Sequence, residues 1–359
     1  MNIRFAIVLF ILLNDLVTGL TVSNSHNQCF RFFSPLNEDK YRSDVPSDSL
    51  GLPLPNLLYL PGFDGSLIAP FIQFPELSTS FNVWGLEVDA DDRSSFEDLV
   101  AAIVSFVLEF PTGIYLVGES NGGLLAAEVA LQLENSSQDS LHGLCLINPA
   151  TSYLRSTFGI KAPAVANLPH PLYSAGLASL LPLFLDKHQF PQLLKIVNGA
   201  YLPSVIDSPA REAYMGRIAM TLGQRLPVMP QATLVWRLDK WLATGCLAVT
   251  DERLAVLRTR CLVVCGDADL VLPSLDEAER LSKVIPGCET FVVQGAGHCS
   301  TCGSRCDLAA VLRNRFEELQ RPGLRTAMKP EAFEGIGTWE FGMETRKHPA
   351  VGPLNYWKL

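Results

Sequence analysis

IYLVGESNGGLLA, residues 114–126, is the most informative stretch of this chain. A short apolar strand, Ile114–Val117, runs into the pattern G-x-S-x-G, and a helical pattern begins directly after it. This order of strand, turn and helix is the signature of a nucleophile elbow. Ser120 is predicted to occupy the strained turn, because Gly118 and Gly122 bring no Cβ atom into the crowded backbone. Its hydroxyl group would then be exposed at the edge of a sheet.

Two backbone N–H groups near this turn are predicted to form an oxyanion hole, the set of donors that stabilises negative charge on a reacting carbonyl oxygen. One is the N–H of Asn121, next to the start of a predicted helix (Gly122–Leu133), where the helix dipole is positive. The other is the N–H of Phe63, in the turn-rich loop PGFDGS (61–66) that follows an apolar strand, Asn56–Leu60. The alternative interpretation of this loop is an ordinary turn between a strand and a helix.

Strands and helices alternate in two segments, 51–152 and 251–320, which we expect to form the core. Besides the elements named above, apolar spacing predicts strand Asn82–Val88, a helix from Phe96 to about Phe110 capped by Ser95, strands Gly143–Ile147 and Arg260–Cys265, helix Asp276–Val284, strand Thr290–Val293 and helix Leu308–Leu319. Such alternation is typical of an α/β fold, with a mostly parallel sheet covered by helices on both faces.

The alternation stops at Asn148-Pro149-Ala150-Thr151. Residues 153–250 are rich in Pro and Leu and contain helical pieces such as Gln192–Val197 and Ala210–Leu222, without a strand repeat. We therefore expect a helical cap inserted over the sheet, whose aromatic side chains either pack in the core or face an apolar substrate. Residues 321–359 carry Pro, Gly and charge without periodicity, and we expect them to form a loose tail.

A serine, an acid and a histidine follow one another in an order that has catalytic meaning, each after a predicted strand. His298 ends the glycine-rich stretch GAGH, and it is the histidine that could reach Ser120 as a base. Asp269 is predicted to hold the imidazole in the correct tautomer, with Asp267 as the alternative acid. Taken singly, Asp269 could cap the next helix and His298 could belong to an ordinary turn. Together these residues predict a catalytic triad.

The cysteines indicate no metal site. Cys261 and Cys265 would lie about 13 Å apart on one strand, too far for a disulfide, so we expect them to be buried as small apolar residues. The cluster CSTCGSRC (299–306) has two alternatives, a disulfide plus a free thiol or three of four zinc ligands. The sequence has no second C-x-x-C pair, and the adjacent His298 already has a predicted role. We therefore expect no metal and no cofactor.

Composition restricts the class of protein. The chain has 359 residues, of which 48% are apolar and 18% charged, enough to bury a large core. The net charge is −9 and Lys and Arg do not cluster, which argues against a nucleic acid partner. An acidic enzyme that acts on neutral or lipid substrates fits this composition better.

The first fifty residues carry two targeting patterns. Residues 1–19 contain Arg4, an apolar run (5–13) and a small-residue end, which is typical of a signal peptide. The run is shorter than the roughly 20 residues that a membrane helix needs. Residues 20–50 are interpreted as a transit segment or linker, because 20–37 contains no acidic residue, as in plastid transit peptides. We expect entry into the secretory pathway and a plastid location through a bipartite signal, with the endoplasmic reticulum or secretion as the alternative.

Four stretches carry a resemblance to a known family: PGFDG (61–65), LVGESNGG (116–123), NPATS (148–152) and residues 234–273. Over roughly residues 50–320 the chain resembles the hydrolase half of the plastid phytyl ester synthase family, the esterase/lipase/thioesterase group of the α/β-hydrolase superfamily. The resemblance implies the α/β-hydrolase fold and acyl transfer onto phytol and diacylglycerol from acyl-CoA, acyl carrier protein or galactolipids. Plant members continue into an acyltransferase-like domain with the motif H-x4-D, which this sequence lacks. Either the hydrolase half works alone or the chain is truncated.

These observations predict a serine ester hydrolase or acyltransferase that acts on a lipid ester or another acyl donor through an acyl-Ser120 intermediate. Water as the acceptor would give hydrolysis, and phytol or diacylglycerol would give a new ester. Peripheral membrane association would suit such substrates. The alternatives are a short-chain carboxylesterase and a catalytically silent binding protein with the α/β-hydrolase fold. An epoxide hydrolase would instead require Asp at position 120.

Overall fold

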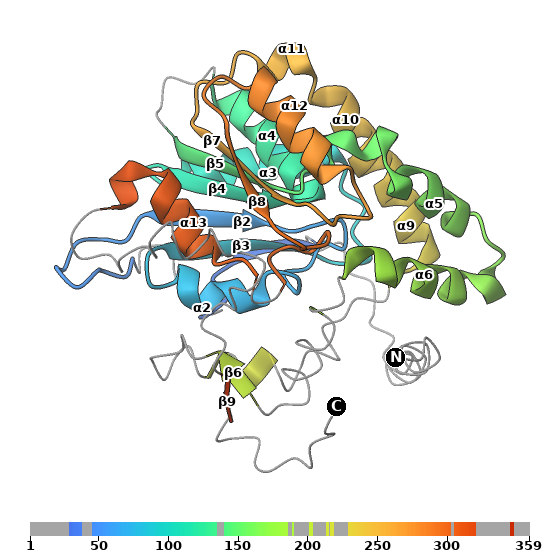
Figure 1. The fold of residues 1–359 in the computed structure, drawn as a ribbon, viewed down its shortest axis with the longest axis horizontal. Coiled ribbons are helices and arrows are strands. Elements are labelled where there is room, and N and C mark those ends of the chain that lie inside the picture. The colour runs from blue at the N-terminus through green and yellow to red at the C-terminus, as the bar shows by residue number, and fades with distance from the viewer. Residues whose placement is uncertain are drawn as a thin grey trace.

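The computed structural model describes residues 29–37, 45–134, 140–185, 189, 201–203, 213–214, 216–218, 229–302, 305–320 and 345–347. Within these residues, seven strands form a central sheet in the order β1-β3-β2-β4-β5-β7-β8 (Figure 1). In chain order the strands are β1 (Phe30–Phe33), β2 (Asn56–Leu60), β3 (Asn82–Val88), β4 (Ile114–Glu119), β5 (Leu141–Ile147), β7 (Cys261–Gly266) and β8 (Glu289–Val293). All neighbouring strands are parallel except β1, which is antiparallel to β3, so the mostly parallel sheet is confirmed.

Helices cover both faces of the sheet. One face carries α3 (Phe96–Leu108), α4 (Asn121–Leu133) and α12 (Ser274–Val284), and the other carries α2 (Phe74–Leu77) and α13 (Leu308–Arg315) (Figure 1). Each face has its own apolar cluster. Along β4, Leu116 packs into the first cluster, whereas Tyr115 and Val117 pack into the second. Burial on both faces explains why the predicted strands are nearly continuous apolar runs.

The helix ends follow local chemistry. Ser95 caps α3 as predicted, since its Oγ accepts from the N–H of Asp98 (3.1 Å) and the Asp98 carboxylate accepts from the N–H of Ser95 (2.9 Å). The predicted helix Leu308–Leu319 is divided into α13 and a 3-10 turn, η4 (Glu317–Leu319). The break falls at Phe316, which leaves the helical conformation and packs its buried ring against Tyr115.

Strand β1 was not predicted from the sequence. It lies within 20–50, the segment that we expect to be a transit segment or linker. The ring of Phe32 stacks on that of Phe106 in α3, with their centroids 4.1 Å apart, while Phe33 faces the opposite cluster. The stretch FRFF is too short to show a clear alternation, and its partners are more than fifty residues away.

The cap segment is helical in most of its described residues, as predicted. It contains α5 (Thr157–Ala166), α6 (His170–Phe184), α9 (Gln231–Arg237), a π-helical turn η3 (Leu238–Ala243) and α10 (Thr244–Ala248), following a 3-10 helix, η2 (Ala150–Arg155). An unpredicted short strand, β6 (Tyr201–Pro203), pairs with β9 (Thr345–Lys347) from the predicted tail. Gln192–Val197 lies outside the described residues, whereas 213–214 and 216–218 are helical. Among the described residues, none of the helices has both the length and the hydropathy that a bilayer-spanning segment requires.

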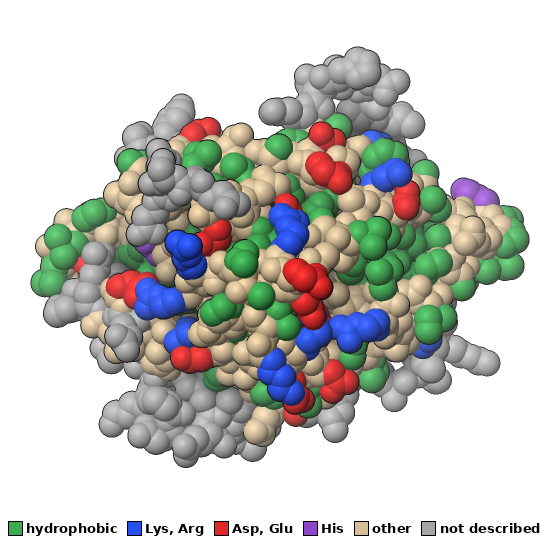
Figure 2. Space-filling view, turned by 90° about the horizontal axis from the view of Figure 1, so that it is seen from above, with side chains coloured by type: hydrophobic (Ala, Val, Ile, Leu, Met, Phe, Trp, Pro, Cys, Tyr) green, Lys and Arg blue, Asp and Glu red, His purple; other side chains and the backbone are tan. Residues whose placement is uncertain are grey.

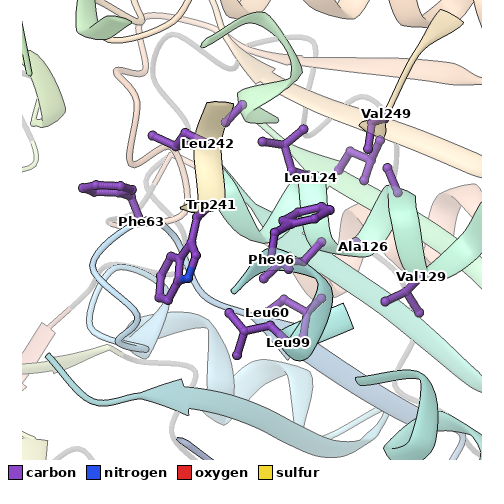
Figure 3. Packing of buried hydrophobic residues seen from close by; sticks show 14 of the residues in the cluster. Leu60, Phe63, Phe96, Leu99, Leu124, Ala126, Val129, Trp241, Leu242 and Val249 are labelled. Atoms are coloured by element: carbon purple, nitrogen blue, oxygen red, sulfur yellow. The ribbon is translucent and has the colours of Figure 1, made fainter. Parts of the chain in front are cut away.

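Two elements of the cap, η3 and α10, pack directly against the core. Trp241 and Leu242 lie close to Phe96 and Leu124 from the core helices (Figure 3). Gly245 at the start of α10 lets the two layers approach, because a Cβ atom there would lie only 2.9 Å from the Phe96 ring. The cap is therefore joined to the core through continuous apolar packing, which fixes its position above the carboxyl ends of the strands.

Candidate active site

The turn between β4 and α4 has the geometry of an elbow. The backbone of Ser120 has φ 55° and ψ −114°, a conformation that residues with a Cβ atom rarely adopt. A Cβ atom on Gly118 would lie 2.1 Å from the carbonyl oxygen of Gly122, and one on Gly122 would lie 2.4 Å from that of Leu60. Both glycines are therefore needed by the close backbone packing. The helix begins at Asn121, one residue earlier than predicted.

The sheet brings three predicted site residues together. Ser120 Oγ is 3.0 Å from His298 Nε2, and His298 Nδ1 is 2.8 Å from Asp269 Oδ2. The three residues come from the ends of β4, β7 and β8, whose parallel register places their carboxyl ends at one edge. Ser120 is 8% exposed and His298 only 3%, so the arrangement is largely shielded from water.

The structure distinguishes the two candidate acids. Asp269 Oδ1 accepts from the N–H groups of Val271 (2.8 Å) and Leu272 (3.1 Å), which aims its second oxygen at His298. Asp267 is exposed, and its Oδ1 accepts from the N–H of Gly295 (2.6 Å). Asp269, and not Asp267, is therefore the carboxylate that contacts the histidine.

The charges around His298 stabilise the protonated form of its imidazole ring. Burial alone would lower the pKa of His298, but the charge of Asp269 and its hydrogen bond raise that pKa above the ordinary value. Burial likewise tends to raise the pKa of Asp269, yet His298 and the hydroxyl of Ser274 hold it below the ordinary range. Asp269 is thus ionised near neutral pH and stabilises positive charge on the ring.

The predicted oxyanion donors border Ser120 from two sides. Asn121 follows it as the first residue of α4, and the loop 61–66 lies alongside, since a Cβ atom on Gly62 would be 3.8 Å from Ser120 Cβ. Phe63 is buried in this loop. The side-chain amide of Asn121 is also buried, and neither of its polar atoms has a hydrogen-bond partner among the residues that the structure describes.

Aromatic rings from the cap reach the histidine. The ring of Phe63 contacts that of Phe158 edge to face (5.7 Å between centroids), Phe158 contacts Phe184 in the same way (5.6 Å), and Phe184 contacts the His298 ring (5.7 Å). Phe158 and Phe184 belong to α5 and α6. The site is therefore bordered by apolar surface on its cap side.

A sequence model described as "Alpha/beta hydrolase family" matches residues 57–304, well over half of the chain. The chain belongs to the alpha/beta hydrolase family. Two solved structures share its fold: the enol-lactonase from Burkholderia xenovorans LB400 (13% identity, TM-score 0.54, 81% of this chain and 95% of that one) and MenH from S. aureus (14%, TM-score 0.52, 82% and 100%).

Two curated relatives are more similar in sequence to this α/β hydrolase. They are phytyl ester synthase 1, chloroplastic, and phytyl ester synthase 2, chloroplastic, both from Arabidopsis thaliana. The identities are 28% and 26%, and each match covers 79% of this chain. The matches cover 38% and 39% of the two relatives, so the chain spans less than half of their length. The resemblance noted in the sequence is confirmed.

A buried arginine, for which the sequence predicted no role, holds the loop 61–66 of this α/β hydrolase. Arg237, at the end of α9, donates to the carbonyl oxygens of Phe63 (3.0 Å) and Asp89 (2.6 Å), and its guanidinium lies over the Trp241 ring. Burial lowers its pKa to about 10, partly offset by nearby carboxylates including Asp64, so it stays charged at neutral pH. The signal in the sequence was one arginine directly after the apolar stretch LVW (234–236).

Asn148 is the second residue whose role was missed. It has φ 40°, which asparagine tolerates better than most residues. Its amide nitrogen donates to the carbonyl oxygen of His298 and to Ser300 Oγ (3.1 Å), while its amide oxygen accepts from the N–H of Gly266 (2.8 Å). Asn148 therefore connects the ends of β5 and β7 to the histidine loop. The sequence showed only that the strand pattern stops here.

The cysteines take no part in this geometry. All nine are described and none forms a disulfide. Cys261 and Cys265 are buried on β7, as predicted, and the alternative of a disulfide within the cluster 299–306 is not present. Among the described residues, no group of three or more His, Cys, Asp or Glu side chains is arranged to hold a metal ion.

Proposed function

We propose that this α/β hydrolase is a serine ester hydrolase or acyltransferase that acts on lipid esters through an acyl-Ser120 intermediate. The observation that carries this proposal is the chain of contacts from Ser120 through His298 to Asp269. A serine hydroxyl is a weak nucleophile unless an adjacent base removes its proton, and this base must itself be held in the correct tautomer. The three side chains meet both requirements.

In the first half of the reaction, Ser120 Oγ attacks the ester carbonyl as its proton passes to His298 Nε2. The oxyanion receives hydrogen bonds from the N–H groups of Phe63 and Asn121, and Asp269 stabilises the imidazolium. The imidazolium then returns the proton to the departing alcohol, which leaves an acyl ester on Ser120.

In the second half, an acceptor hydroxyl attacks the acyl ester while His298 removes its proton. Water as the acceptor gives a carboxylic acid. Phytol or diacylglycerol as the acceptor gives a new ester, and the apolar surface formed by Phe158 and Phe184 supports such an acceptor by limiting access of water. No cofactor is needed, because each proton moves through His298.

Similarity to proteins named phytyl ester synthases supports lipid donors and acceptors, and their designation as chloroplastic supports a plastid location. We infer that residues 1–19 act as a signal and that the chain continues to the plastid, with the endoplasmic reticulum or secretion as the alternative. We also propose 51–152 with 251–320 as the catalytic core and 153–250 as the cap.

Labelling with a fluorophosphonate probe tests the proposed nucleophile. The purified protein is expected to form a covalent adduct at Ser120, identified by peptide mass spectrometry, because the probe reacts with an activated serine. The adduct is expected to be lost in Ser120→Ala. A protein that remains folded and unlabelled would instead support the catalytically silent binding protein.

Acyl chain length distinguishes a lipid enzyme from a short-chain carboxylesterase. Long-chain p-nitrophenyl esters are expected to have a higher kcat/KM than acetyl esters, since each buried CH₂ group adds up to about 0.8 kcal/mol until the apolar surface is filled. The measurement is a chain-length series run with and without added phytol or diacylglycerol. A preference for acetyl or butyryl esters, with no ester product from either alcohol, would reduce the protein to a short-chain esterase.

Helix α6 supports peripheral membrane association. Residues 162–185 contain no Asp, Glu, Lys or Arg, and of the 15 residues of α6 only Tyr173 and Leu180 are buried. Leu172 is 55% exposed and Leu181 39%. Hydrophobic side chains gather at the right-hand end of the molecule in Figure 2, where α5 and α6 lie in Figure 1. The end of this helix contacts the histidine through Phe184, so a lipid surface on α6 would adjoin the site.

The protein is therefore expected to sediment with vesicles of uncharged galactolipid, with little effect of added salt because no cation mediates the contact. Leu172→Glu combined with Leu181→Glu should reduce vesicle binding by about tenfold or more, since each exposed leucine contributes roughly 1.5–3 kcal/mol when buried. The control is Leu50→Glu, because Leu50 is 61% exposed and precedes the amino end of the central strand β2, away from α6. Equal binding of all three proteins would contradict this surface.

A further inference from the structure

A buried carboxylate lies directly beside the nucleophile and is not used by the triad. Glu119 is the last residue of β4 and is 3% exposed. Its side chain accepts a hydrogen bond from Tyr59 Oη (2.8 Å) on the neighbouring strand β2. Thr301 Oγ1 donates to the same carboxylate at 3.1 Å. A carboxylate is seldom buried without such compensation, because removing its charge from water is costly.

These hydrogen bonds connect the strand of the nucleophile to the loop of the base. Glu119 immediately precedes Ser120, and Thr301 follows His298 by three residues. Gln73 donates to the carbonyl oxygen of Thr301 (2.8 Å), which holds this part of the loop from the other side. The carboxylate is therefore fixed relative to both reacting side chains.

We propose that Glu119 is a positioning residue that places a second negative charge near the His298 imidazole and joins the histidine loop to the nucleophile strand. This inference rests on the proposed function and deepens it, because it assigns part of the activation of Ser120 to a residue outside the triad. Glu119 acts through His298 and does not touch the substrate. Its contribution depends on whether it is ionised.

The surroundings of Glu119 set that ionisation. Burial raises the pKa of Glu119, and the hydrogen bond from Tyr59 and the positive charge of His298 partly offset this rise. The resulting pKa is about 7. The charge of Asp64, from the loop 61–66, acts in the opposite direction. Among the described residues, the phenol of Tyr59 and the thiols of Cys299 and Cys306 also interact with the charge of Glu119. Their pKa values are raised by burial, so these groups stay neutral at pH 7.

The coupling between Glu119 and His298 has a definite sign. Ionised Glu119 raises the pKa of His298, and protonated His298 lowers the pKa of Glu119. When the imidazole takes the proton of Ser120, the anionic form of Glu119 stabilises the resulting cation. Below its pKa, Glu119 is neutral and supplies only hydrogen bonds. The reactivity of Ser120 is therefore expected to increase as pH rises through 7, beyond what the titration of His298 alone produces.

Two substitutions separate the charge of Glu119 from its shape. Glu119→Gln keeps the hydrogen-bonding shape and removes the charge. It should lower the rate of Ser120 activation about five- to tenfold above pH 7, the factor for up to one unit in the pKa of the base. Near pH 5, where Glu119 of the wild type is already neutral, the two rates should be close. Tyr59→Phe removes a donor that favours the anion and so raises the pKa of Glu119 further. This variant should be as slow as Glu119→Gln near pH 7 and recover the wild-type rate at high pH.

The readout is the second-order rate constant for fluorophosphonate labelling of Ser120, measured on the full chain from about pH 5 to pH 9, where the base and Glu119 titrate. Labelling reports activation of the serine directly and needs no knowledge of the natural substrate. The matched control is Glu277→Gln, because Glu277 is an equally buried carboxylate that binds Arg155 and Arg280. This control should lose thermal stability while its pH profile stays that of the wild type.

The outcomes test the role of Glu119 separately from the proposed role of Ser120 as the nucleophile. Recovery of Tyr59→Phe at high pH, without recovery of Glu119→Gln, supports the charge of Glu119. A labelling rate of Glu119→Gln within twofold of wild type across the pH range, or an equal loss in Tyr59→Phe at every pH, would overturn it and leave Ser120 as the nucleophile. Absence of labelling in the wild type would instead refute the proposed function.

Discussion

Ser120→Ala and His298→Ala are each expected to abolish ester turnover while the protein remains folded. The loss should be about 10³- to 10⁶-fold, since the proposed nucleophile and the proposed base would act in the chemical step and work as a unit. For the same reason, the double variant should be no slower than the slower single one. The measurement is kcat on a long-chain p-nitrophenyl ester, together with circular dichroism and a thermal melt.

Matched controls separate chemistry from folding. Ser95→Ala removes the cap of α3, so it should cost about 1 kcal/mol of stability and leave turnover unchanged. His142→Ala removes a histidine at the amino end of β5 and should also retain turnover. If either folded active-site variant kept more than a few per cent of the wild-type rate, assignment of the triad would have to be abandoned.

Asp269→Asn is expected to lower turnover by about 10⁴-fold, through the wrong histidine tautomer. The N–H groups of Val271 and Leu272 bind Oδ1, so the new amide nitrogen would face His298 Nδ1 as a donor. The imidazole would then carry its proton on Nε2, where it cannot accept one from Ser120. The pKa of Asp269 is held below the ordinary value, so the acid limb of the wild-type pH profile should not arise from this residue.

Asp267→Asn is the comparison, since the two residues share a loop and a charge. The Asp267 carboxylate accepts a hydrogen bond from Gly295 and is exposed, so its loss should change turnover by no more than about threefold, as for most surface substitutions. Both variants should be assayed for kcat at the same pH with equal folded fractions. The opposite ranking would transfer the role of acid to Asp267.

Much of the core could be predicted because its signals are local. Strands β2 and β3 have the predicted bounds, and Ser95 caps α3 as expected, since an apolar run or a cap depends on residues only a few positions apart. The elbow is equally local, because two glycines flank one serine between a strand and a helix. Chain order then sufficed to name Ser120 and His298 as the candidate nucleophile and base.

The missed residues share a different property. Arg237 binds Phe63 from 174 positions away, Asn148 binds His298 from 150 away, and Glu119 binds Tyr59 from 60 away. A polar residue within an apolar run carries no local sign of its partner. Its importance becomes visible only when folding buries it and a specific donor or acceptor offsets the loss of water.

The sequence alone determines the α/β class, the elbow at Ser120 and the position of His298 after β8, the last strand of the central sheet. Each is encoded in consecutive residues with a characteristic spacing. The choice between Asp267 and Asp269 required the tertiary structure. Both lie in one short loop after β7, and either could reach the ring of His298 by chain length. The backbone N–H groups of Val271 and Leu272 decide which carboxylate turns toward the imidazole, and their positions depend on how the loop packs against the cap.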